Sequence, residues 1–117
     1  MSERPHYRLD AWKESMALVK AIYKTTQGFP REEVYGLTQQ IRRAAVSVPS
    51  NLAEGAARTS RKEFSRFISI AKGSLSERET QLLIAADLQY IDRDSLIFPQ
   101  VEKVSRLLAG LHKSLVS

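Results

Sequence analysis

A row of polar side chains lies along one edge of a helical pattern in the middle of the chain. At about 100° per residue, their spacing of three and four residues places five side chains on one face: Gln40, Arg43, Ser47, Asn51 and Glu54. Such a row suits either mutually satisfied hydrogen bonds that fix helix register or a subunit contact, or else a binding or catalytic groove. Because the row has no His or Cys and its mixed side chains fit no single chemistry, the structural interpretation is favoured.

A second polar row occurs further along the chain, again at helical spacing: Ser74, Glu77, Arg78 and Gln81. If the two helices pack antiparallel, the two rows face each other, and we call these nine residues the polar seam. Arg78 projects onto the middle of an apolar stripe, where an unpaired cation would be strongly destabilising. The sequence therefore predicts that Arg78 pairs with a carboxylate such as Glu54 or Glu77, or reaches solvent along its stem.

Basic residues exceed acidic ones, with 18 Lys and Arg against 13 Asp and Glu and a net charge of +5. The excess is concentrated between Arg58 and Lys72, where Glu63 is the one acidic residue. The candidate contacts to phosphate, which we call the basic set, are Arg42, Arg43, Arg58, Arg61, Lys62, Arg66 and Lys72. Contacts of this kind would bind RNA or DNA without sequence preference and weaken steeply with salt. Solvated charges with no partner are the competing interpretation.

Other chemistries find little support in the sequence. Cysteine is absent, and the two histidines lie far apart in the sequence, His6 in the expected tail and His112 near the end of the last helical segment, so we expect no metal and no cofactor. No phosphate-binding glycine loop or nucleophile motif occurs, which favours a protein that is not an enzyme. The longest apolar runs are far shorter than a membrane span, so we expect a soluble, cytoplasmic protein.

Four amphipathic segments must position these residues. Apolar residues recur with helical periodicity over residues 10–27, 31–57, 61–90 and 98–115, and no segment alternates as a strand would. We therefore predict an all-α fold, an antiparallel up-down-up-down four-helix bundle formed by residues 1–117 as one domain, with residues 1–8 as a flexible tail. The apolar phase passes through Pro49 without slipping, which predicts one continuous second helix with a kink there.

Several apolar residues lie outside the main stripes: Leu18, Tyr35, Val46, Ile70, Ile84, Leu88 and Ile91. A second apolar set that recurs on a helix is more typical of a subunit contact than of scattered surface residues. The pattern predicts an oligomer without indicating how many copies it contains.

The central stretch QIRRAAVSVPSNLAEG and the later AKGSLSE together carry a resemblance. The chain resembles the four-helix bundle proteins encoded in intervening sequences of bacterial large-subunit rRNA genes, and more distantly the accessory variability protein of diversity-generating retroelements. The resemblance implies a left-handed bundle assembled as a homopentamer, and the distant relative binds nucleic acid and a reverse transcriptase. The matching positions, for which we expect structural roles, are Ser47, Asn51, Glu54, Gly55, Gly73, Ser74 and Glu77.

The resemblance leaves two functions open. One is a basic oligomer that binds nucleic acid, and the other is a structural ring that recruits a protein partner such as a reverse transcriptase. This sequence departs from the family pattern at Arg78, where the family usually has leucine.

Overall fold

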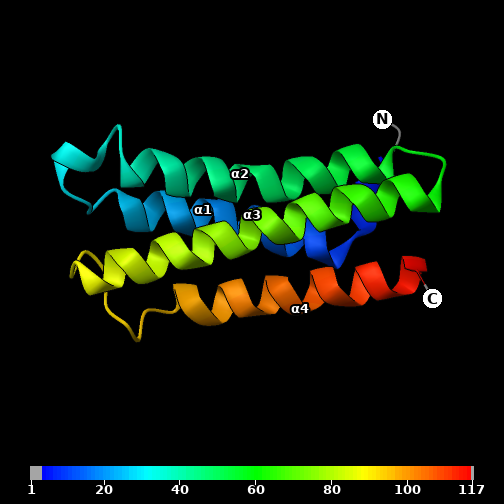
Figure 1. Ribbon diagram of the computed structural model, residues 1–117. Helices are drawn as coiled ribbons and strands as arrows, with labels where there is room; N and C mark the ends of the chain where they lie inside the picture. Colours follow the sequence, from blue (N-terminus) through cyan, green and yellow to red (C-terminus); the bar gives the residue numbers. More distant parts are fainter. Residues whose placement is uncertain (1–3, 117) are drawn as a thin grey trace.

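Four long helices make up most of the computed structural model, which describes residues 4–116. They are α1 (Asp10–Thr26), α2 (Leu37–Ala56), α3 (Arg61–Asp87) and α4 (Ile97–Val116), accompanied by two short 3₁₀ helices, η1 (Pro5–Arg8) and η2 (Arg31–Glu33). Each long helix runs opposite to the one before it, and the α2–α3 turn lies at the same end as both chain ends (Figure 1). The predicted all-α class with four helices is confirmed, and residues 4–116 contain no strand.

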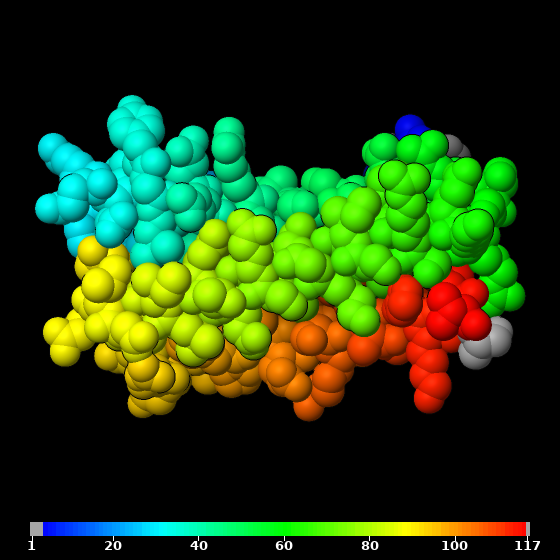
Figure 2. All heavy atoms as spheres, in the orientation of Figure 1, coloured from blue at the N-terminus to red at the C-terminus, as the bar shows by residue number. Residues whose placement is uncertain are grey.

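The core lies on the axis of an elongated bundle that measures 43 × 31 × 21 Å (Figure 2). Each helix packs against the next one, and α1 closes the bundle against α4. Each helix buries its apolar stripe, with fully enclosed side chains such as Ile22, Ile41, Leu82 and Val104. Leu18 was expected in the outer apolar set, but it is 1% exposed and belongs to this core.

The second helix is continuous, with Pro49 inside it and buried. A proline removes one backbone donor, and two neighbouring side chains bond carbonyls in the same turns. The Ser50 hydroxyl donates to the Val46 carbonyl (2.8 Å), and Asn51 Nδ2 donates to the Ser47 carbonyl (2.8 Å). The kink at Pro49 stays a prediction.

The start of α2 differs from the prediction, because the helix begins at Leu37 rather than directly after Pro30. Gly36 precedes it with φ −113° and ψ −115°, a non-helical conformation at the N-cap of α2, and η2 has already ended at Glu33. Glu33 acts as the cap, since its Oε1 accepts from the Leu37 amide (3.2 Å). Its Oε2 accepts from the Tyr90 hydroxyl (2.9 Å) and so joins the α1–α2 and α3–α4 connections.

The remaining helix ends follow local signals. The predicted capping box is confirmed, because Ser60 Oγ accepts from the Glu63 amide (3.1 Å) and α3 begins at Arg61. The third helix ends at Asp87, before the predicted position 90, since Gln89 adopts φ 66° and the Tyr90 amide turns back to the Ala85 carbonyl (2.9 Å).

The N-terminal segment was expected to be a tail over residues 1–8, but Pro5–Arg8 forms η1 and packs on α1 and α2. The His6 and Tyr7 rings lie 5.0 Å and 5.4 Å from the Trp12 ring, measured between centroids. Residues 1–3 lie outside the described part of the chain. An aromatic cluster thus holds part of a segment whose sequence shows no helical periodicity.

Candidate functional site

The polar seam is present where α2 and α3 cross. Ser47 Oγ lies 2.9 Å from Ser74 Oγ, the contact that antiparallel packing of the two rows predicts. Asn51 Nδ2 donates to the same Ser47 Oγ (2.9 Å), so three side chains share one small network. Each group satisfies another, which supports a structural role at this point.

The other end of the seam is looser and closer to solvent. Gln81 Nε2 lies 3.5 Å from Gln40 Oε1 and 3.4 Å from Glu77 Oε1, whereas Gln81 Oε1 has no partner among residues 4–116. Two predicted members lie elsewhere. Glu54 forms an exposed ion pair with Arg58 (3.1 Å), and Arg43 is exposed beside a groove that Tyr23 and Thr26 of α1 also line.

Arg78 contradicts the prediction that it pairs or reaches solvent. Its side chain is 0% exposed, and Nε, Nη1 and Nη2 have no hydrogen-bond partner within the described range. The two carboxylates that the sequence suggested bond Arg58 and Gln81 instead. Burial lowers the pKa of Arg78 to about 10, although the nearby charge of Glu79 acts in the opposite direction.

The basic set does not form one surface. Around the α2–α3 turn, Arg58 lies over the Phe67 ring (5.1 Å to the centroid) and Arg61 donates to the Ser114 carbonyl (2.7 Å). Lys62, Arg66 and Lys72 are exposed on α3. Arg42 and Arg43 lie apart from these, on a groove between α1 and α2.

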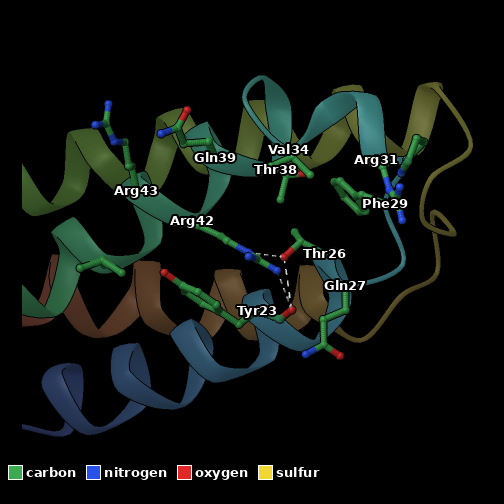
Figure 3. A pocket seen from close by; sticks show the side chains of 12 residues that line it. Tyr23, Thr26, Gln27, Phe29, Arg31, Val34, Thr38, Gln39, Arg42 and Arg43 are labelled. Atoms are coloured by element: carbon green, nitrogen blue, oxygen red, sulfur yellow. Dashed lines mark hydrogen bonds between the residues drawn. The ribbon is translucent and has the colours of Figure 1, made fainter.

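This groove, which sequence reasoning missed, has a volume of about 690 Å³. Arg42 crosses it from α2 toward α1, where its Nε donates to Thr26 Oγ1 (2.8 Å) and its Nη2 to the Tyr23 carbonyl (3.3 Å), as Figure 3 shows. The guanidinium also lies 4.5 Å from the Tyr23 ring centroid. The lining residues are Tyr23, Thr26, Gln27, Phe29, Pro30, Arg31, Val34, Thr38, Gln39, Arg42, Arg43 and Val46.

A weak signal for the groove was present in the sequence. Thr38 and Arg42 lie four residues apart on α2, and Tyr23 and Thr26 lie three apart on α1, so each pair shares a helix face. Periodicity did not reveal that the two faces meet, because that depends on the path of the α1–α2 connection.

No group of three or more His, Cys, Asp or Glu side chains in residues 4–116 has the proximity that a metal ion requires. None of the helices described there has both the length and the apolar character needed to cross a bilayer.

Comparison with known proteins gives two similarities. Residues 7–110 match the model of the family described as 23S rRNA-intervening sequence protein. A crystal structure of a protein of unknown function from the S23 ribosomal protein family of Bacteroides thetaiotaomicron has the same fold, with a TM-score of 0.65 and 23% identity over 91% of this chain and 94% of that one. No curated protein matches the chain. Since the family match spans nearly the whole bundle, the chain belongs to the 23S rRNA-intervening sequence protein family.

Proposed function

We propose that this protein is a non-enzymatic homo-oligomer that binds RNA or DNA through the phosphate backbone. The observation that supports this function is the group of exposed cations on α3, namely Lys62, Arg66 and Lys72, which have no hydrogen bond or ion pair with residues 4–116. Arg58 and Arg61 lie near this group at the α2–α3 turn, but Arg58 pairs with Glu54 and Arg61 donates to the Ser114 carbonyl. Cations without a carboxylate partner are available to phosphate oxygens, and an oligomer would repeat them in every copy.

We expect the wild-type protein to retain a short RNA or DNA on a filter at low salt and to lose it at high salt. The triple variant Lys62→Ala, Arg66→Ala, Lys72→Ala should bind more weakly at low salt. The slope of the logarithm of the binding constant against the logarithm of the salt concentration should also be shallower, by roughly 0.7 to 0.9 for each phosphate contact removed.

The matched control is the triple variant Lys13→Ala, Lys20→Ala, Arg106→Ala, which removes the same charge from exposed positions on α1 and α4. It should bind nearly as the wild type does. No retention at low salt would refute nucleic-acid binding, and an equal loss in the control would refute the assignment to α3.

Oligomerisation is supported by large apolar side chains that remain exposed on α2, on α3 and in the residues next to their ends. Val46, Ile70, Ile84 and Leu88 are 40–49% exposed, and Tyr35 is 90% exposed. Burial of such a recurring set is a strong driving force for assembly. We expect native mass spectrometry to give five times the chain mass of 13.2 kDa, the homopentamer that the resemblance implies, and a monomer would contradict the assembly.

The alternative function is a ring that recruits another protein, such as a reverse transcriptase. The same exposed apolar residues favour it, because they offer a non-ionic surface to a partner. A stable complex that survives nuclease treatment and high salt would favour recruitment over binding of nucleic acid.

A further inference from the structure

The groove between α1 and α2 has a strong positive charge that no lining residue neutralises. Three of its lining residues are arginines, Arg31, Arg42 and Arg43, and none is acidic. The nearest capping carboxylate, Glu33, is engaged with the Leu37 amide and the Tyr90 hydroxyl. The groove therefore favours an anion.

Arg42 is held in place before any ligand arrives. Its Nε–H bonds Thr26 Oγ1, and Thr26 is itself fixed because its hydroxyl donates to the Ile22 carbonyl (2.8 Å). Both partners of the guanidinium are neutral oxygens, so its charge is not cancelled. Nη1 takes no part in these bonds and remains a donor for an oxyanion. The planar guanidinium suits the oxygens of a phosphate.

Thr38 supplies a second and independent observation. Its side chain is 6% exposed, and Oγ1 has no hydrogen-bond partner in the described part of the chain. Thr38 lies one turn before Arg42 on α2 and lines the same groove (Figure 3). A buried hydroxyl without a partner is destabilising, and a hydrogen bond to a ligand oxygen in the groove would remove that cost.

The groove also has a wall for a flat, apolar body. The ring of Phe29, which is 8% exposed, lines it and packs against Tyr90, with 5.4 Å between ring centroids. Val34 and Pro30 continue this wall, and the amides of Gln27 and Gln39 can both donate and accept at its edge. Its volume of about 690 Å³ lies within the range of small-molecule sites.

We propose that this groove binds a nucleoside monophosphate unit, with the phosphate at Arg42 and Thr38 and the base against Phe29 and Val34. The negative charge of the phosphate monoester would be attracted by the arginines, which have no acidic neighbour in the lining. The base would pack on the apolar wall and form hydrogen bonds with the glutamine amides. The unit is either a free nucleotide or the phosphorylated end of a strand. This site is separate from the cations on α3, so it stands even if the α3 surface binds no nucleic acid.

Titration calorimetry on the full-length protein with AMP tests the proposal. We expect heat from AMP binding at concentrations up to about 1 mM, with much weaker binding of adenosine and of inorganic phosphate. Thr38→Val removes only the hydroxyl and should weaken AMP about 5- to 10-fold, and Arg42→Met should weaken it about 10- to 100-fold. Arg106→Met, which removes an exposed arginine from α4, is the matched control and should leave AMP binding unchanged.

The variants are chosen so that a folding defect does not decide the result. Arg42 links α2 to α1, whereas Thr38→Val removes a buried group without a partner and should fold at least as well as the wild type. AMP binding that is absent, unchanged in Thr38→Val, or equalled by adenosine or phosphate alone would overturn the proposal.

Competition with an oligonucleotide identifies the source of the unit. If an oligonucleotide with a 5′-phosphate displaces AMP and its 5′-hydroxyl counterpart does not, the groove takes the end of a strand. If neither displaces AMP, the groove takes a free nucleotide. If the 5′-hydroxyl oligonucleotide displaces AMP equally well, a terminal phosphate is not recognised and the proposal fails.

Discussion

Replacing Arg78 with methionine is expected to raise the free energy of unfolding by about 3 kcal/mol. Burial lowers the pKa of Arg78 to about 10, and this fall from the ordinary value of an arginine corresponds to roughly this cost at about 1.4 kcal/mol per pKa unit. Methionine keeps an unbranched stem of similar shape and removes three nitrogens that have no partner in residues 4–116. Urea denaturation at one fixed protein concentration measures the change.

Arg66→Met is the matched control, because Arg66 is an exposed arginine on the same helix. Its free energy of unfolding should change by no more than about 0.5 kcal/mol. A clear loss of stability in Arg78→Met would contradict the argument, since it would mean that the guanidinium stabilises the fold.

The destabilisation that the buried charge of Arg78 causes depends on pH. Because the folded-state pKa of Arg78 lies below the unfolded value, the unfolded chain holds the extra proton from about pH 10 up to the ordinary pKa of an arginine. The penalty is therefore fully present below about pH 10 and is relieved as the pH rises through that window. The stability difference between Arg78→Met and the wild type should be constant near neutral pH and shrink above about pH 10, whereas a difference that stays constant would exclude this cause.

The position of Arg78 was predictable from the sequence, but its environment was not. Periodicity placed it correctly in the apolar stripe of α3, but the rule that buried charges are paired gave the wrong environment for it. A buried cation is usually compensated by a carboxylate. Whether Glu54 or Glu77 can reach Arg78, however, depends on how α2 and α3 are rotated about their own axes. Here that rotation leaves Glu54 at the surface beside Arg58.

The four helices were predictable because each carries a long amphipathic signal. Ser60 and Glu63 fixed the start of α3, and the spacing of Ser47 and Ser74 predicted their contact. The start of α2 was predicted too early because Pro30, Glu32 and Glu33 suit the first turn of a helix. These residues lead into the separate short helix η2, and the non-helical backbone at Gly36 delays α2 to Leu37. The groove was not predicted because it depends on a contact between residues of two helices, Arg42 and Thr26, which are sixteen residues apart in sequence.

Replacing Gly55 with alanine is expected to lower the free energy of unfolding by about 1–3 kcal/mol, the usual cost of overpacking. An added Cβ would lie 2.7 Å from Phe67 Cβ and 2.9 Å from Phe64 Cδ1. Phe67 Cβ is attached directly to the α3 backbone, so it has no freedom to move aside. Gly55 thus allows the close approach of α2 and α3, the most extensive helix contact in the bundle.

Gly73→Ala is the matched control, because Gly73 also lies inside a helix but has nothing within 4 Å of an added Cβ. Alanine is the better helix former by about 1 kcal/mol, so thermal unfolding should show stabilisation at position 73 and destabilisation at position 55. The opposite signs separate helix propensity, which both substitutions improve, from packing, which only one disturbs. If Gly55→Ala were as stabilising as Gly73→Ala, α2 and α3 would have to lie further apart than the structure places them.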